Sequence, residues 1–326
     1  MRVLVTGSSG HLGEALCRVM HTDRRFEAIG LDILPSPHTA VVGSVGDRSL
    51  VRELLGAVDA VVHAATLHKP HVGTHSRQEF VDANVTGTLT LLEEAVAASV
   101  SRFVFTSTTS AFGRALTPPP GAPAAWVTEE VPPVPRNIYG VTKTWAEDLC
   151  ELVHRDHGLP VVVLRTSRFF PEADDRDDVR SAFADANLKI NELLYRRVDI
   201  EDAVEAHLLA LEHAPDLGFG RYIVTATTPF GPEDLAALRM DAPAVVRRLV
   251  PHYEEVYGRH RWRMFDSIER VYVNAAARRA LGWEPRYDFA TAVERVAAGE
   301  EWRSALSLAV GAKGYHAEST GPYTVR

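Results

Sequence analysis

Tyr139 and Lys143 place a phenol and an ammonium group four residues apart in the segment Tyr-Gly-Val-Thr-Lys. In a helix this spacing puts both side chains on one face. A tyrosine with an ordinary pKa of about 10 is a poor base at neutral pH, but a neighbouring positive charge stabilises its phenolate. The pair could therefore move a proton to or from a substrate hydroxyl. Taken alone, it could equally be a chance pairing on a helix surface.

A glycine-rich turn near the start of the chain favours the chemical interpretation. The segment Thr6-Gly-Ser-Ser-Gly-His-Leu-Gly13 separates an apolar stretch from a helical pattern. We expect Gly7 to allow the tight turn, Gly10 to let the backbone approach a pyrophosphate, and Gly13 to let the helix pack close to the sheet. The helix N-terminus would then attract the diphosphate. Together with the tyrosine–lysine pair, this turn indicates redox chemistry on a nicotinamide cofactor.

An acidic residue selects between the two nicotinamide cofactors. Asp32 closes the strand that is predicted over about Phe26–Leu31. Its carboxylate can accept hydrogen bonds from both hydroxyls of the adenosine ribose, and it would repel a 2′-phosphate. No Arg or Lys follows at Ile33 or Leu34 to neutralise such a phosphate. The sequence therefore predicts NAD rather than NADP.

Hydroxyl side chains gather at the end of another predicted strand, in Thr106-Ser-Thr-Thr-Ser110. Ligands bind at the carboxyl ends of the strands in open parallel sheets. We therefore expect one of these hydroxyls to hold the substrate oxygen while Tyr139 takes the proton.

These residues need a scaffold, and the chain shows short apolar strands alternating with helical patterns. Strands are predicted at Val3–Thr6, about Phe26–Leu31, Val41–Val42, Ala60–His63, Arg102–Thr106, Val161–Arg165 and Tyr222–Thr225. Helices are predicted at Leu12–Met20, Leu50–Leu55 (after an N-cap at Asp47), Glu79–Ala98, Val141–His154 and Ala203–His213. The alternation is typical of an α/β fold with a doubly wound parallel sheet of the Rossmann type. We expect a cofactor domain over 1–167 and about 196–225, and a smaller, mostly C-terminal substrate lobe over 168–195 and 226–326.

Two segments break this alternation. Thr117–Pro135 is rich in Pro and small residues and is expected to be a surface loop without a regular element. Glu172–Arg180 is a run of charges, interpreted as a solvated loop, with the alternative that it grips a cationic group of the substrate.

The overall composition excludes several classes of protein. The 35 Lys and Arg residues against 43 Asp and Glu residues give a net charge of −8, which argues against nonspecific binding to nucleic acid. The two cysteines, Cys17 and Cys150, form neither a disulfide framework nor a metal-ligand cluster. A strand predicted to start at Arg2 leaves no room for a signal peptide, and no apolar run is long enough to span a membrane. We expect a cytoplasmic protein.

Several motifs together make the chain resemble the extended short-chain dehydrogenase/reductases, and in particular the NAD-dependent epimerase/dehydratase group that includes the UDP-galactose epimerases. The resemblance covers about residues 1–300. Besides the glycine turn and the tyrosine–lysine pair, it rests on Val61–Ala65, Asn84–Thr88, Phe105–Gly113, Val127–Glu130, Val198–Asp202 and Leu281–Pro285.

The resemblance implies a role for individual residues. Thr108, Tyr139 and Lys143 take the places of the catalytic residues, with Lys143 tuning Tyr139 and binding the nicotinamide ribose. Contacts to NAD are implied for Gly7, Ser9, Gly10, His11, Leu12, Gly13, Asp32, Ser44, Val45, Ala64, Ala65, His68, Asn84, Thr106, Tyr139, Lys143, Thr166 and Ser167. Contacts to the substrate are implied for Thr108, Thr109, Arg168 and Asn187. The resemblance also implies a homodimer with a four-helix interface made by Glu79–Ala98 and Val141–His154.

The chain departs from the family pattern where substrates are recognised. Ser44 replaces a frequent aspartate, His68 replaces a frequent lysine, and Ser167-Arg168 stands where the epimerases have an aromatic residue followed by Asn. The stretch between Phe170 and Val198, which usually grips the nucleotide diphosphate, is unusually short.

Three functions remain open at this point. The first is epimerisation of a sugar, with a nucleotide-linked sugar preferred, through a keto intermediate. Thr109-Ser110 after the catalytic threonine, where dehydratases have Asp-Glu, disfavours dehydration. The second function is net oxidation or reduction of a smaller alcohol or carbonyl compound, which the short stretch favours. The third is a nucleotide sensor without turnover, which the intact catalytic set disfavours.

Four histidines, His63, His68, His71 and His75, look like a metal site but lack neighbouring carboxylates or thiols. We predict no metal. His63 is expected to be a satisfied buried histidine, and the others are expected to lie in a loop lining the cofactor or substrate cleft.

Overall fold

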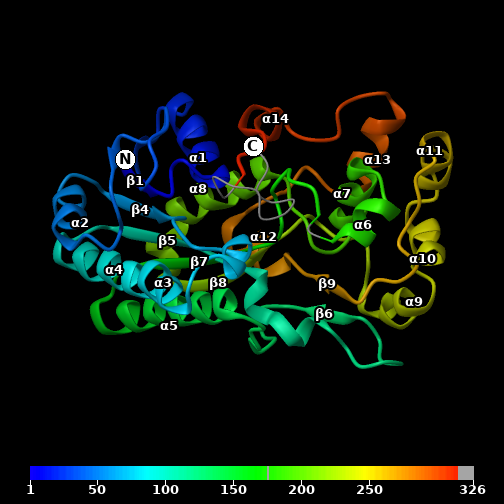
Figure 1. Cartoon of the computed structure of the whole chain (residues 1–326), viewed down its shortest axis with the longest axis horizontal. Coiled ribbons are helices and arrows are strands. Elements are labelled where there is room, and N and C mark those ends of the chain that lie inside the picture. Colours follow the sequence, from blue (N-terminus) through cyan, green and yellow to red (C-terminus); the bar gives the residue numbers. More distant parts are fainter. Residues whose placement is uncertain (175, 315–326) are drawn as a thin grey trace.

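The parallel sheet predicted from the sequence dominates the computed structural model, which describes residues 1–174 and 176–314. Within these residues, seven parallel strands form one sheet in the order β3-β2-β1-β4-β5-β7-β8 (Figure 1). They are β1 (Arg2–Thr6), β2 (Glu27–Asp32), β3 (Val41–Val42), β4 (Ala60–His63), β5 (Arg102–Thr108), β7 (Val161–Thr166) and β8 (Phe219–Val224). The strand order reverses at β1, which pairs with β2 on one side and β4 on the other. Ligands bind at such a reversal, beyond the carboxyl ends of the strands.

Alternate residues of the strands point to opposite faces of the sheet, and each face is covered by helices. Val3 and Val5 of β1 face a core shared with α1 (His11–Thr22), α8 (Ile200–Leu217), α12 (Ala275–Leu281) and α14 (Ala305–Val310). Leu4 faces the other core, which includes α2 (Arg48–Leu55), α4 (Gly87–Ala97) and α5 (Ile138–His157). The predicted α/β fold of the Rossmann type is confirmed.

The segment predicted as one helix over Glu79–Ala98 is interrupted. It consists of α3 (Arg77–Val81), a π-helical turn at Asp82–Thr86, and α4. The π-turn adds a residue to the helical repeat, so the helix continues in direction but its hydrogen bonds shift. A hydrophobic period cannot reveal such a local change.

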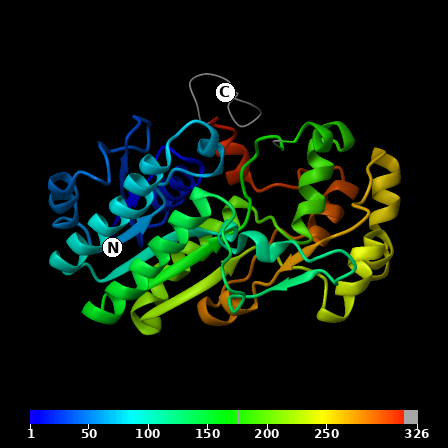
Figure 2. The same cartoon turned by 60° about the horizontal axis from the view of Figure 1, so that its bottom comes forward.

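A third hydrophobic core lies beyond the sheet. It belongs to a lobe built from separate parts of the chain (Figure 2). Its elements are α6 (Asp177–Ala182), α7 (Asp185–Leu193), α9 (Leu235–Met240), α10 (Ala242–Leu249), α11 (Tyr253–His260), α13 (Phe289–Ala297) and the two parallel strands β6 (Ala125–Val127) and β9 (Arg270–Tyr272). In contrast, α12, Trp283 and α14 pack on the core of the sheet. Residues 315–326 of the expected lobe lie outside the described residues.

The prediction that Thr117–Pro135 holds no regular element is wrong, because β6 lies within it. Ala125, Trp126 and Val127 pair in parallel with Arg270, Val271 and Tyr272. A strand of three residues beside several prolines has no visible alternation, so only its distant partner strand reveals it.

No helix within residues 1–174 and 176–314 has the length and apolar character that crossing a membrane requires.

Candidate active site

A cleft of about 1440 Å³ opens at the carboxyl ends of β1, β4, β5 and β7. Its wall combines the glycine-rich turn, the ends of these strands, the start of α5, and residues of β9 from the lobe. Most residues predicted to touch cofactor or substrate line it: Gly7, Ser9, Gly10, His11, Leu12, Gly13, Asp32, Ser44, Val45, Ala64, Ala65, His68, Thr106, Thr108, Thr109, Tyr139, Thr166, Ser167 and Arg168.

The glycine-rich turn has no room for a side chain at Gly7 or at Gly13. Gly7 has φ +73°, and a Cβ there would lie 2.8 Å from the backbone nitrogen of Ala65. A Cβ on Gly13 would lie 2.0 Å from the carbonyl oxygen of Gly7. The first turn of α1 is therefore pressed against the end of β1. The first N–H groups of a helix have no partner within the helix, and Gly10, His11, Leu12 and Gly13 line the cleft, so the residues present fit the pyrophosphate of a dinucleotide.

Asp32 is held beside this turn by two backbone amides. One carboxylate oxygen accepts a hydrogen bond from Ser9 N at 2.9 Å, and the other accepts one from Leu34 N at 2.9 Å. The carboxylate is thus fixed where an adenosine ribose would lie. The next residues in the cleft wall, Ile33 and Leu34, are apolar and well exposed.

The start of α5 positions the phenol. Asn137 caps the helix by accepting a hydrogen bond from Gly140 N at 3.1 Å, which places Tyr139 in the first turn. Tyr139 is hydrogen-bonded to Thr108, at the end of β5. Burial raises the pKa of Tyr139 to about 12, and the hydrogen bond with Thr108 opposes this rise. Burial therefore works against the phenolate that catalysis needs.

Lys143 lies beneath the cleft surface, one helical turn after Tyr139. Its Nζ donates to the carbonyl oxygen of Thr106 at 2.7 Å and lies 3.9 Å from the centre of the Phe105 ring. Burial lowers the pKa of Lys143 to about 7, although the charge of Glu147 opposes this. The ammonium is thus less favoured than the sequence suggested, because that expectation considered the tyrosine–lysine pair without the apolar core around it.

Glu147 is a supporting residue that the sequence reasoning missed. Both of its carboxylate oxygens receive hydrogen bonds from Arg165, and Ser107 donates to one of them at 2.5 Å. The charged side chains are almost completely buried. This network joins α5, β5 and β7 below the catalytic residues. The signal was present, because Glu147 continues the spacing of Tyr139 and Lys143 along one helix face.

Two other predicted residues lie outside the cleft wall. Asn84 exchanges two hydrogen bonds with the backbone of Leu67, both 2.8 Å long, and so shapes the loop after β4. Asn187 bonds the backbone of Arg263 within the lobe. Their amides hold neighbouring chain segments, whereas direct contacts to ligands were expected.

Arginines line the end of the cleft that adjoins the lobe: Arg136, Arg168, Arg196 and Arg270. Of these, only Arg168 was predicted. Its guanidinium lies 2.7 Å from Asp174 and 3.1 Å from Glu192. The other three come from separate segments of the chain, so no local motif reveals them.

The interpretation of the charged run as a solvated loop is wrong for its first part, which is buried, and for its end, which lies in the helix α6 (Asp177–Ala182). Glu172 and Asp174 are buried, with exposed fractions of 8% and 5%. Each contacts a distant basic side chain: Glu172 contacts His11, and Asp174 contacts Arg168. A run of charges in a sequence does not show that partners from elsewhere will cover it.

The histidines occupy two environments. His63 is fully buried between the hydroxyls of Thr6 and Thr88, at 2.7 and 2.9 Å, and burial lowers its pKa to about 3. The expectation of a satisfied buried histidine is confirmed. His68, His71 and His75 line the cleft, as expected, with neighbouring rings 4.8 and 5.0 Å apart.

Comparison with known proteins agrees with this geometry. Residues 3–224 match the model of the NAD dependent epimerase/dehydratase family. The chain is 26% identical to a UDP-glucose 4-epimerase of Rhizobium meliloti, over 90% of this chain and 94% of the relative. It is 30% identical to the low-salt glycan biosynthesis protein Agl12 of Haloferax volcanii, over 52% of this chain and 57% of that relative, so this match spans only about half of each protein.

A solved structure extends the likeness to the whole fold. A short-chain dehydrogenase/reductase superfamily protein from Agrobacterium tumefaciens, with bound NAD, superposes with a TM-score of 0.64 at 24% identity. The match covers 91% of this chain and 96% of that one. Since the family model spans more than half of the sequence, this chain belongs to the NAD-dependent epimerase/dehydratase family.

Proposed function

We propose that this protein is an NAD-dependent epimerase that acts on a nucleotide-linked sugar. The observation that carries the proposal is the single cleft that brings the glycine-rich turn and Asp32 together with Thr108 and Tyr139. We propose the same contacts to cofactor and substrate that the sequence analysis named. Asn84, Lys143 and Asn187 are the exceptions: they lie outside the cleft wall, and we propose that they act from there.

The residues divide the reaction between them. Tyr139 accepts the proton of the substrate hydroxyl, and Thr108 donates a hydrogen bond to the same oxygen. Bound NAD supplies the acceptor that takes the hydride from the carbinol carbon and later returns it. After the ketone has rotated in the cleft to present its opposite face, Tyr139 returns the proton to the oxygen as the carbonyl is reduced. The product is therefore the epimer of the substrate, with one stereocentre inverted, and the cofactor would end in its oxidised form.

The positive charge of the oxidised nicotinamide completes this site. Burial holds the pKa of Tyr139 at about 12, so phenolate needs nearby positive charge. The ammonium of Lys143, one turn away, supplies one charge and the cofactor ring supplies the other.

The arginine-lined end of the cleft supports an anionic substrate such as a nucleotide diphosphate sugar. The Nε atom of Arg270 is buried without a hydrogen-bond partner among the described residues, and Arg136 and Arg196 lie along the same wall. The relative from Rhizobium meliloti is a UDP-glucose 4-epimerase, which agrees with this substrate class.

A second candidate is net oxidation or reduction of a smaller alcohol or carbonyl compound. The observation that favours it is that polar side chains in the short segment before Val198 are already bound to other parts of the protein. Asn187 is committed to the backbone of Arg263, and Glu192 engages Arg168, Arg196 and Arg197. Little of this segment is left to wrap a nucleotide.

We also propose the molecular context of the enzyme. The cofactor domain comprises 1–167 and about 196–225, and the substrate lobe comprises 168–195 and 226–326, with α12 and α14 packing back on the sheet. A homodimer through α4 and α5 is supported by Trp145 and Leu152, which are 50% and 39% exposed on α5. A cytoplasmic location is supported by two cysteines that are buried free thiols.

The cofactor experiment comes first. The purified protein is denatured and the released nucleotide is identified by chromatography. Near-stoichiometric NAD supports an epimerase that recycles its cofactor. An empty protein that binds added NAD favours the dehydrogenase, and released NADP contradicts the role given to Asp32.

Turnover is then tested with UDP-glucose and Tyr139→Phe. We expect conversion of UDP-glucose to UDP-galactose by the wild type, and a rate about 10²–10⁴-fold lower in the variant, because the proton acceptor is lost. Retained NAD binding in the variant is the control for folding. Unchanged turnover in Tyr139→Phe would overturn the proposed role.

A further inference from the structure

Glu172 connects three parts of the chain that border the cofactor end of the cleft. Its Oε1 lies 2.8 Å from Nε2 of His11, the first residue of α1. The same oxygen accepts a hydrogen bond from the backbone amide of Lys313 at 3.0 Å. The side chains of His11 and Glu172 are 4% and 2% exposed. One buried carboxylate thus holds both the pyrophosphate-binding helix and the C-terminal segment.

The C-terminal segment reaches the cleft from a fixed anchor. The helix α14 packs through Val310 into the same core as Leu12 and Leu16 of α1. Residues 311–314, which we name the strap, then place Lys313 and Gly314 in the wall of the cleft. The ammonium of Lys313 also pairs with Glu14, in the first turn of α1. The strap therefore lies against the helix end that would hold the cofactor diphosphate.

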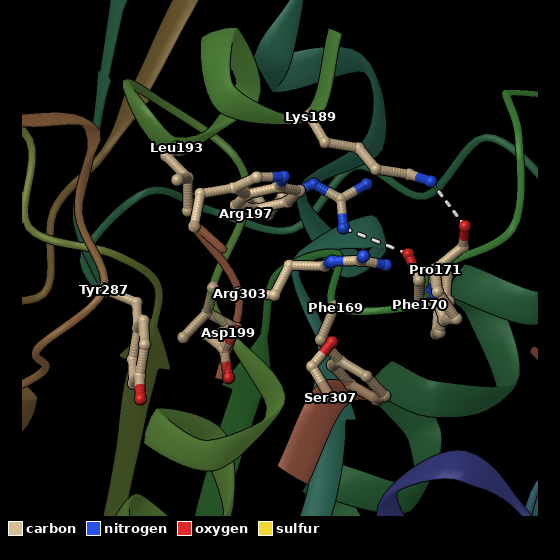
Figure 3. A pocket seen from close by; sticks show the side chains of 12 residues that line it. Phe169, Phe170, Pro171, Lys189, Leu193, Arg197, Asp199, Tyr287, Arg303 and Ser307 are labelled. Atoms are coloured by element: carbon tan, nitrogen blue, oxygen red, sulfur yellow. Dashed lines mark hydrogen bonds between the residues drawn. The ribbon is translucent and has the colours of Figure 1, made fainter. Parts of the chain in front are cut away.

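The loop that carries Glu172 is itself held by two basic side chains, one on α7 and one shortly after it. Arg197 donates to the carbonyl oxygen of Phe170 at 3.0 Å, and Lys189 donates to that of Pro171 (Figure 3). These contacts border a small cavity of about 20 Å³, which has room for no more than about one water molecule. The position of Glu172 is thus fixed by both domains, because the loop is pinned on one side by α7 and on the other by His11.

The ionised form of Glu172 is favoured despite its burial. Burial alone would raise the pKa of this carboxyl, but the hydrogen bond and charge of His11 and the amide of Lys313 outweigh it and keep the pKa below its usual value. A buried carboxylate oxygen that contacts an imidazole and accepts a hydrogen bond from a backbone amide makes strong, directional contacts.

We propose that Glu172 is a cofactor-retaining residue: it clasps α1 to the strap, so that bound NAD leaves the cleft slowly. The inference rests on the proposed cofactor site and deepens it, since an enzyme that regenerates NAD in each cycle gains from keeping it bound. Release requires the strap to part from α1, and the contacts of Glu172 must break before it can.

The test measures cofactor release in Glu172→Gln. The protein is loaded with NADH, chased with excess NAD, and followed by the loss of bound NADH fluorescence. We expect release to be at least about tenfold faster than in the wild type, because charge-assisted hydrogen bonds are replaced by weaker ones. Electrostatic repulsion alone predicts slower release from the variant, since the variant removes a negative charge near the diphosphate. Unchanged or slower release from the folded variant would overturn the clasp.

Two further variants isolate the strap without touching the buried carboxylate. Lys313→Pro removes the amide that donates to Glu172, whereas Lys313→Ala retains it. We expect faster release in Lys313→Pro than in Lys313→Ala, and equal rates would overturn the clasp even if Glu172→Gln does not fold. Glu129→Gln is the matched control, because Glu129 is partly buried and likewise accepts a hydrogen bond from a backbone amide, that of Ile223, but lies outside the cleft wall.

The outcomes for the wild type separate the two proposals. A wild-type protein that binds no NADH would overturn the proposed function and the clasp together. If the wild type binds NADH but releases it as fast as Glu172→Gln and Lys313→Pro do, only the clasp is overturned, and the proposed function stands.

Discussion

Tyr139 and Lys143, the proposed catalytic pair, are buried titratable groups whose pKa values move in opposite directions for one reason. Burial disfavours charge, so it raises the pKa of Tyr139 to about 12 and lowers that of Lys143 to about 7. Burial thus acts against the charged form of both groups, and Lys143, with a pKa of about 7, is only partly charged near neutral pH. The positive charge of bound oxidised NAD would add to that of Lys143, which ties proton transfer to the presence of the cofactor.

The depressed pKa of Lys143 predicts a pH-dependent effect on stability. An unfolded lysine titrates near 10.5 and the folded one at about 7, so between these values the unfolded chain binds more protons. The free energy of unfolding therefore rises with pH across this window, and the full cost of burying the ammonium is present below it. We expect Lys143→Met to stabilise the protein more, relative to the wild type, at pH about 6 than at pH about 9.

Urea denaturation at the two pH values measures this difference. Lys69→Met, at an exposed lysine, is the control. It should change the free energy of unfolding by the same amount at both pH values. A pH-independent effect of Lys143→Met would show that the ammonium is not buried at a cost.

Asp32 should decide the choice of cofactor. We expect Asp32→Asn to weaken NAD binding by about tenfold, since hydrogen bonds to a charged acceptor are lost, and to narrow the preference for NAD over NADP. Dissociation constants for both nucleotides measure this. Asp47→Asn is the control, because Asp47 also accepts two backbone amides but only caps α2. Unaltered cofactor preference in Asp32→Asn would contradict the assignment.

At the scale of elements, one face of α5 presents the proposed catalytic residues Tyr139 and Lys143, and the next turn presents Glu147, which anchors the helix. Tyr139, Lys143 and Glu147 follow each other at intervals of four residues, and the last joins the helix to β5 and β7. The buried ion pair of Glu147 and Arg165 thus fixes the helix against the sheet that carries Thr108.

This predicts an asymmetric response to mutation. Glu147→Leu should lower the free energy of unfolding by about 3–5 kcal/mol, because the guanidinium of Arg165 is left buried without its partner. The double variant Glu147→Leu/Arg165→Met should recover most of the loss. Glu151→Leu, one turn further at an exposed contact with Arg221, should change it by less than about 1 kcal/mol. Additive losses in the double variant would show that the two residues act independently.

At the scale of the whole molecule, the cleft is walled by the carboxyl edge of the sheet and by residues of the lobe, and the sheet and the lobe each have a hydrophobic core. The proposed cofactor side comes mainly from the first half of the chain, with the strap added from the C-terminal part, whereas β9 and the loop after β7 also line the cleft. The other side of α5 leaves apolar side chains exposed, which is where we place the second subunit.

The proposed dimer predicts the effect of one charge on this surface. Trp145→Glu should convert the dimer to a monomer, because a large aromatic anchor is replaced by a solvated carboxylate. Light scattering coupled to gel filtration measures the mass. Met240→Glu, at a 79% exposed residue of α9, should leave the mass unchanged. A wild-type protein that is monomeric would refute the proposed dimer.

Local patterns were sufficient for the part of the protein that depends on neighbours in sequence. The glycine turn, the strand ending at Asp32 and the helix bearing Tyr139 and Lys143 all follow from spacing, periodicity and capping, which act over a few residues. The fold class and the use of NAD could be predicted for this reason.

The tertiary structure alone decided what depends on residues far apart in the chain. It covered Glu172 and Asp174 with distant basic groups, gave Asn187 a structural partner, and paired a strand in the Pro-rich segment with β9. It also reversed the expected shift of the Tyr139 pKa, because burial is a property of the surrounding core. Ion pairing, strand pairing and burial all depend on neighbours in three dimensions. Local sequence therefore determined which cofactor is used, whereas the tertiary structure determined which charged side chains are buried and what they contact.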